Sequence, residues 1–247
     1  MEAQDYFSKW QDWGTVDLVH ELEHLITLTT ARCLLGREIR ENINEEVPAL
    51  VCDIAGKFST AKAAVWTGAY LLQHKTHLSK ALEEQKALLG RHGSKIDFDI
   101  LREMDVLYRC IKEAIRIGPP PIIIPRYCRK SFTITTKEGN KYMIPKGHIV
   151  ATSPRVANHA DHVFKDPDRY DPDRYLSAEG KEMASQSFSY TSFGGGRHTC
   201  PGEVFAYMKL KIIWCYLIRN FELNLASVLT EGEWNGTDKI LVHYKRR

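Results

Sequence analysis

The chain has 247 residues, of which 43% are hydrophobic, and its formal net charge is +3 at pH 7. Such a length and apolar content suffice for a sizeable core, and so small a net charge predicts no nucleic-acid partner. The six cysteines contain no Cys-x-x-Cys pair, which excludes a zinc ribbon and a thioredoxin-like site, and they are too sparse for a secreted disulfide scaffold.

The first half of the chain is predicted to be helical. A helix begins at Thr15 or Asp17 and runs to about residue 35, because leucines recur along one face and Gly36 follows. Further helices are predicted over residues 49–73, 79–89 and 97–117. The last of them ends where the sequence Gly-Pro-Pro-Pro over residues 118–121 removes the backbone donors that a helix needs.

The pattern changes after these prolines. Alternation over residues 131–136 and 141–144 predicts a β-hairpin, and residues 149–151 are compatible with another strand. Residues 155–190 are rich in Asp, Pro and Arg and predict an ordered meander without regular structure. A helix over 202–219 and two short strands, 221–225 and 240–244, complete the chain. The predicted fold class is therefore mainly α with small β-sheets.

One decapeptide carries the strongest chemical signal, Phe193-Gly-Gly-Gly-Arg-His-Thr-Cys-Pro-Gly202. Three consecutive glycines allow the backbone to turn and to approach another group closely. Proline is favoured at the first helical position, so Cys200 is predicted to cap the following helix, where a thiolate is stabilised. A thiolate on such a loop suits the axial position of haem iron. The alternative is a buried free cysteine beside a glycine turn.

This loop, with the pattern Phe-x-x-Gly-x-His-x-Cys-x-Gly, resembles the haem-binding loop of the cytochrome P-450 family. Two further motifs occur in the family's order: Glu113 and Arg116 on one helical face, and Pro172-Asp-Arg-Tyr175, which is similar to the family's Pro-Glu-Arg-Phe segment. The resemblance implies that Arg174 joins Glu113 and Arg116 to fix the meander beneath the haem. Taken alone, Glu-x-x-Arg is most often an exposed helix pair.

Longer stretches are similar to the sterol 14α-demethylases, above all to the plant obtusifoliol 14α-demethylases. They lie at residues 15–18, 31–37, 105–116, 144–154, 164–168 and 205–207. The resemblance implies an incomplete cytochrome P-450 fold, with a single partial domain over residues 1–247 and its haem-binding half at 97–225.

The resemblance also implies roles for individual residues. Haem b would be held through its iron by Cys200, and Ser59 would hold the water that delivers protons to bound oxygen. The haem propionates would be reached by His198 and Arg126. The remaining implied residues are Phe193, Gly196 and Gly202 at the haem, and Ala55, Ile122, Ile123 and Ile124 at the sterol pocket, although a core strand would look the same as the three isoleucines.

The implied partners are a sterol substrate and cytochrome P-450 reductase, which passes electrons from NADPH. By resemblance the location is the endoplasmic reticulum membrane. No stretch of this chain reaches the length of a membrane span and its first residues do not form a signal peptide, so we expect no membrane anchor in this chain, which leaves the cytoplasm as the alternative.

Two departures from the family pattern bear on activity. It reads Ala55-Gly-Lys-Phe-Ser59 where the family reads Ala-Gly-x-His-Thr, and Phe58 cannot relay a proton. Only a short stretch between Arg40 and Ala55 replaces the helices that roof the substrate pocket. Two hypotheses follow: an active haem-thiolate monooxygenase that removes a sterol 14α-methyl group, and a truncated, catalytically inactive relative.

A zinc protease is the third hypothesis. The segment His20-Glu21-Leu-Glu-His24 fits His-Glu-x-x-His, which would place both histidines on one helical face. Glu41 or Glu45 is available as a third ligand, but no further motif singles one out. In the family resemblance this segment is an exposed stripe of a structural helix.

Overall fold

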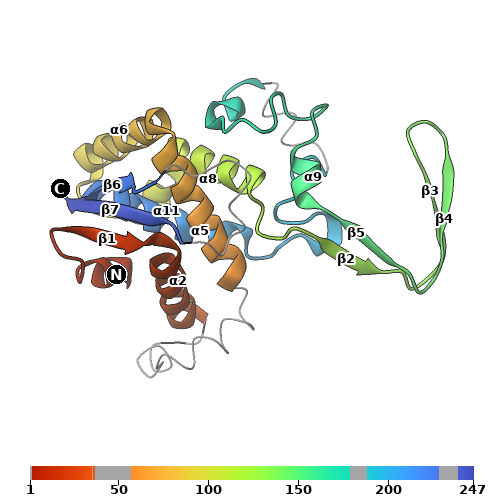
Figure 1. The fold of residues 1–247 in the computed structure, drawn as a ribbon, viewed down its shortest axis with the longest axis horizontal. Helices are drawn as coiled ribbons and strands as arrows, with labels where there is room; N and C mark the ends of the chain where they lie inside the picture. The colour runs from red at the N-terminus through yellow and green to blue at the C-terminus, as the bar shows by residue number, and fades with distance from the viewer. Residues whose placement is uncertain (1, 35, 37–56, 179–187, 228–238) are drawn as a thin grey trace.

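The computed structural model describes residues 2–34, 36, 57–178, 188–227 and 239–247. A helical body carries both ends of the chain, and a slender β-hairpin extends away from it (Figure 1). The helices are α1 (Glu2–Phe7), α2 (Leu18–Leu34), α5 (Lys57–Gln73), α6 (Lys75–His92), α7 (Phe98–Glu103), α8 (Asp105–Ile117), α9 (Pro154–Asn158) and α11 (Glu203–Asn220), with short 3-10 turns η1 (Pro172–Tyr175) and η2 (Gly196–His198).

The strands form small antiparallel sheets. One sheet has the order β1-β7-β6 and joins the two ends of the described chain. The other two are pairs, β2 with β5 and β3 with β4. The bounds are β1 (Trp13–Asp17), β2 (Ile124–Tyr127), β3 (Phe132–Thr135), β4 (Lys141–Ile144), β5 (Ile149–Thr152), β6 (Phe221–Leu225) and β7 (Leu241–Arg246).

A single large apolar cluster extends from α1 to β7 and contains side chains of α2, α5, α8 and α11. Trp214 of α11 is completely buried in it, and its indole Nε1 donates to the carbonyl of Ala64 at 3.0 Å. The indole lies so close to α5 that a Cβ at Gly68 would stand 2.4 Å from it. Only glycine therefore fits where α5 and α11 meet.

Most predicted elements are confirmed, with different bounds. The predicted helix 79–89 is wrong at both ends, since α6 begins at Lys75 and continues through Gly90, whose Cα faces open space. The predicted helix 97–117 is two helices divided at Met104. The prediction that residues 155–190 lack regular structure is wrong where they form part of α9 and all of η1. Helix α1 and strands β1 and β2 were not predicted, and residues 49–56 of the second predicted helix lie outside the described residues.

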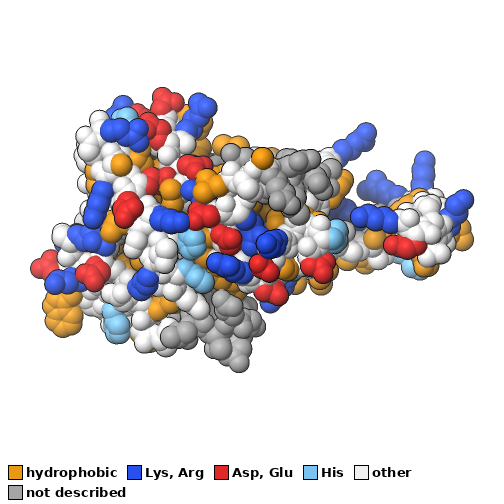
Figure 2. All heavy atoms as spheres, turned by 90° about the horizontal axis from the view of Figure 1, so that it is seen from above, with side chains coloured by type: hydrophobic (Ala, Val, Ile, Leu, Met, Phe, Trp, Pro, Cys, Tyr) orange, Lys and Arg blue, Asp and Glu red, His pale blue; other side chains and the backbone are white. Residues whose placement is uncertain are grey.

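The surface seen in Figure 2 is mixed in charge, and the described helices are not membrane spans. Acidic and basic side chains are interspersed over the body face seen in Figure 2, in keeping with the small net charge. No helix in the described part of the chain combines the length and the apolarity needed to cross a membrane.

Candidate functional site

A cavity of about 480 Å³ lies where α2, α5, α11 and the glycine-cysteine loop meet. This volume is within the range of small-molecule and cofactor sites. Apolar side chains supply much of its wall, among them those of Ala63, Ile115, Phe205 and Leu210. The residues singled out from the sequence that line it are Ser59, Ile124, Arg126, Phe193, His198, Cys200 and Gly202.

The glycine-cysteine loop is closed by its own backbone. The N–H of Cys200 donates to the carbonyl of Phe193 at 2.8 Å. Gly194 has a φ of +77°, and a Cβ there would meet the carbonyl oxygen of His198 at 3.1 Å. Gly196 also has a positive φ, +63°. Glycine is thus required by conformation at both positions, and the resulting turn leaves Cys200 exposed.

The prediction that Cys200 caps the next helix is wrong. The N-cap of α11 is Gly202, and the helix begins at Glu203, so Cys200 and Pro201 precede it. The thiol instead lies at the end of a loop that the Phe193 carbonyl holds in place. Of the described cysteines, Cys200 alone lines the cavity, whereas Cys110, Cys128 and Cys215 are buried elsewhere. The alternative of a buried free cysteine does not describe Cys200.

Several predicted residues do not line this cavity. Ile122 and Ile123 are 59% and 61% exposed, so only Ile124 of the three isoleucines reaches it. Gly196 shapes the loop without lining the cavity. Ala55 lies outside the described residues.

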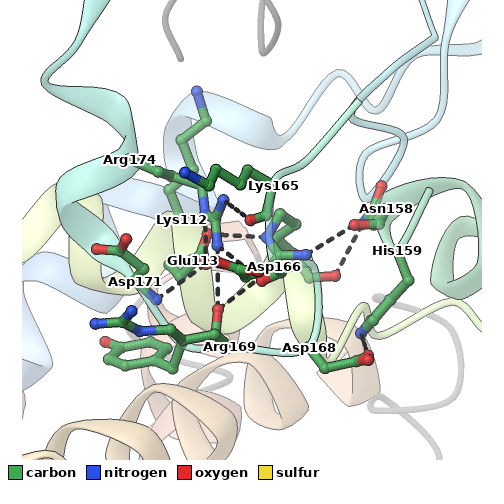
Figure 3. A network of polar contacts seen from close by, with 12 residues as sticks. Lys112, Glu113, Asn158, His159, Lys165, Asp166, Asp168, Arg169, Asp171 and Arg174 are labelled. Atoms are coloured by element: carbon green, nitrogen blue, oxygen red, sulfur yellow. Dashed lines mark hydrogen bonds and ion pairs between the residues drawn. The ribbon is translucent and has the colours of Figure 1, made fainter. Parts of the chain in front are cut away.

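Glu113 and Arg174 lie together in a polar network (Figure 3), to which Arg116 is joined through Glu113. None of the three residues lines the cavity. The guanidinium of Arg116 donates to both carboxylate oxygens of Glu113, from Nε and Nη2, at 2.9 Å each. Arg174 Nε donates to Glu113 Oε1 at 2.8 Å, and the hydroxyl of Tyr175 donates to Oε2 at 2.9 Å. The side chains of Glu113 and Arg116 are fully buried, so the reading as an exposed helix pair is wrong.

The charges in this network compensate one another. Burial disfavours the charged form of Arg116, but the hydrogen bonds and the charge of Glu113 outweigh it and hold the pKa of Arg116 above its usual value. Two bonds between one guanidinium and one carboxylate form the strongest arrangement of such a pair. The network therefore fastens the meander that contains η1 to α8.

Asn158 connects the network to the loop that lines the cavity, and sequence reasoning missed it. The carbonyl of Asn158 accepts from Arg116 Nη1 at 2.8 Å, and its side-chain Nδ2 donates to the hydroxyl of Ser192 at 2.7 Å. Its Oδ1 accepts from the backbone N–H of Thr191 at 3.0 Å. Nothing in the sequence distinguishes this asparagine from its polar neighbours, because its partners come from segments far along the chain.

Lys209 was also missed. It lies on α11, 6% exposed, and it lines the same cavity as Cys200. A sequence signal was present, since Lys209 follows Phe205 at helical i, i+4 spacing on a face that is otherwise apolar.

The residues of the zinc hypothesis have other partners. Glu21 accepts hydrogen bonds from the hydroxyl of Tyr6 at 2.9 Å and from Trp10 Nε1 at 3.2 Å. The side chain of His20 is 75% exposed. Within the described ranges, no three His, Cys, Asp or Glu side chains are placed to hold a metal ion. Glu41 and Glu45 lie outside those ranges.

Comparisons with known proteins agree on one family. The family model for cytochrome P450 matches residues 33–245. The chain is 42% identical over 330 residues to the obtusifoliol 14-alpha demethylase of Sorghum bicolor, an alignment that covers 100% of this chain and 67% of that protein. It is 40% identical to the sterol 14-demethylase of Arabidopsis thaliana, covering 100% and 68%, and 27% identical to the lanosterol 14-alpha demethylase of Homo sapiens, covering 91% and 58%.

The matched stretch of the sorghum protein has 330 residues and this chain has 247, so part of that stretch has no counterpart here. The observed architecture is mainly helical with small antiparallel sheets, as the family resemblance predicted. Because the family model matches most of the chain and similar relatives align with all of it, this chain belongs to the cytochrome P450 family.

Proposed function

We propose that this chain binds haem b through Cys200 and acts as a haem-thiolate monooxygenase that removes the 14α-methyl group of a sterol. The observation that carries this proposal is that Cys200 and Ser59, which are far apart in the sequence, line one cavity of about 480 Å³. The names of the relatives support the sterol as substrate class.

The residues around the cavity fit a haem. Cys200 is an exposed thiol on a turn where glycine conformations leave room for a close approach. Arg126 and His198 line the same cavity and supply N–H donors for the two propionates. Much of the remaining wall is apolar, as the face of a porphyrin requires.

When bound, the haem supplies the oxygen activation that amino-acid side chains lack. Cys200 would hold the iron as a thiolate, the type of ligand that favours oxygen activation. Ser59 Oγ, on the first turn of α5, lines the same cavity and would hold a proton for delivery there.

The proposed electron donor is cytochrome P-450 reductase, which takes its electrons from NADPH. A catalytically inactive relative is the second candidate. It is favoured by the difference in length, because the 247 residues of this chain align with a stretch of 330 residues in the sorghum enzyme. An inactive relative would keep the haem loop and lose turnover. The two candidates therefore differ in reaction and agree in haem binding.

The test begins with haem binding. The full chain is reconstituted with haem, reduced and exposed to carbon monoxide, and the difference spectrum is recorded. We expect the red-shifted band of a thiolate-ligated ferrous complex. Cys200→Ser should lose this band, whereas Cys33→Ser, which changes an exposed cysteine outside the cavity, should retain it. A band that survives Cys200→Ser would overturn the assignment of the ligand.

Turnover separates the two candidates. The reconstituted chain is mixed with the reductase, NADPH and obtusifoliol, and sterols are analysed by mass spectrometry. Appearance of the demethylated sterol supports the monooxygenase. A thiolate band without any demethylated product identifies the inactive relative.

A further inference from the structure

The amine of Lys209 is enclosed at the wall of the cavity. The residue is 6% exposed, and its Nζ donates to the hydroxyl of Thr30 on α2 at 2.7 Å. Nζ also lies 5.1 Å from the centre of the Phe205 ring. The proposed haem contacts do not use this side chain.

The charge of Lys209 has no carboxylate partner among the described residues. An ammonium has three N–H donors, and only Thr30 accepts one from it in the described part of the chain. That hydroxyl gives its own proton to the carbonyl of Ile26 at 2.6 Å. Burial lowers the pKa of Lys209 to about 8, because little nearby charge offsets the loss of water around the ammonium.

Lys211, two residues further along the same helix and on a different face of it, shows the contrast. Its Nζ donates to the carbonyl of Leu101 at 2.7 Å. Burial lowers the pKa of Lys211 as well, but the charges of Glu84 and Asp105 oppose that shift. Lys211 does not line the cavity. It is therefore a matched control, a partly buried lysine of α11 that has two carboxylates nearby.

A buried cation that has no counter-ion among the described residues, on a largely apolar wall, is complementary to an anion that carries an apolar body. We propose that the cavity binds the carboxylate of an apolar acid, with the carboxylate paired to Lys209 and the apolar body against Phe205, Ala63 and Leu210. Two sources share this chemistry. One is a propionate of a porphyrin, which Lys209 would hold in addition to the donors of Arg126 and His198, and the second is a long-chain fatty acid. The porphyrin source rests on the proposed function, and the fatty-acid source does not.

The first arm of the test uses the full chain without haem. Calorimetric titrations with dodecanoate and with dodecanol compare the unmodified protein, Lys209→Met and Lys211→Met. We expect Lys209→Met to weaken dodecanoate binding about tenfold or more, as for the loss of a hydrogen bond to a charged group, and to leave dodecanol binding unchanged. Lys211→Met should bind both ligands as the unmodified chain does. Unchanged dodecanol binding also shows that Lys209→Met retains the cavity.

The second arm uses metal-free protoporphyrin and its dimethyl ester, followed by quenching of tryptophan fluorescence. If a propionate pairs with Lys209, Lys209→Met weakens binding of the free acid and not of the ester. If only dodecanoate distinguishes the variants, the acid is a long-chain one. If neither carboxylate distinguishes Lys209→Met from the unmodified chain, or neither binds, the proposal is overturned.

These ligands contain no iron, so their binding is measured independently of the thiolate band. A dependence on Lys209 without any thiolate band would reject the proposed function and keep this proposal. A thiolate band without a dependence on Lys209 would do the opposite.

Discussion

Replacing Glu113 by glutamine tests whether the buried network holds the fold together. The substitution keeps the shape of the side chain but removes its charge, while Glu113 accepts hydrogen bonds from Arg116, Arg174, Tyr175 and the backbone of Asp171. It leaves the guanidinium of Arg116 fully buried without its counter-ion. Breaking a buried ion pair from one side costs about 3–5 kcal/mol, a large part of the stability of an ordinary domain.

The assay is equilibrium unfolding in urea, followed by circular dichroism. Glu103→Gln is the control, because Glu103 pairs with Arg91 at 2.9 Å with both side chains partly exposed, and such a pair contributes about 0–1 kcal/mol. Adding Arg116→Met to Glu113→Gln removes the orphaned charge, so the double variant should lose less stability than the two single losses added together. A loss below about 1 kcal/mol for Glu113→Gln, or strict additivity, would refute the reasoning.

Three further predictions follow from the same structure. Arg174→Ala should lower the haem bound per chain after reconstitution, measured from the ratio of haem to protein absorbance, because Arg174 ties η1 to Glu113; an unchanged ratio would disprove the link between network and haem. Gly68→Ala should lower the free energy of unfolding in urea by about 1–3 kcal/mol, because its Cβ would meet Trp214. Gly90→Ala, on an open face of α6, should raise it by up to about 1 kcal/mol. Equal effects of the two substitutions would contradict the packing argument. Lys209→Met should raise the free energy of unfolding at pH 7 by roughly 3 kcal/mol, because folding lowers the pKa of Lys209 from 10.5 to about 8. The difference in stability between the variant and the unmodified chain should vanish as the pH rises from 8 to 10.5. A difference that stays constant with pH would show that the amine is not its cause.

Local sequence was sufficient to predict an element where apolar periodicity or the backbone preference of a residue determines it. The leucines of α2 recur on the face that packs into the core, and the glycines before Cys200 demand a turn, so both features were predicted. The hairpin of β3 and β4 was predicted for the same reason, because its partner strands are adjacent in the chain.

Local sequence was insufficient where a distant side chain completes the element. The division at Met104 contains no Gly or Pro; instead the carboxylate of Glu84, on α6, accepts the N–H groups of Val106 and Leu107 and so caps α8 from another helix. The burial of Glu113 and Arg116 likewise depends on partners in the meander, and no i, i+3 pattern reveals it.

The pairing of β1 with β7 closes the described chain into a loop, since Trp13 stands opposite Lys245. Arg246 strengthens the closure by donating to the carbonyl of Trp10 at 2.6 Å. Closing so long a loop carries an entropic cost that is met only when the intervening helices have already brought the ends together. This sheet should therefore be a late event in folding, and its amides should acquire protection from hydrogen exchange after those of α5 and α11.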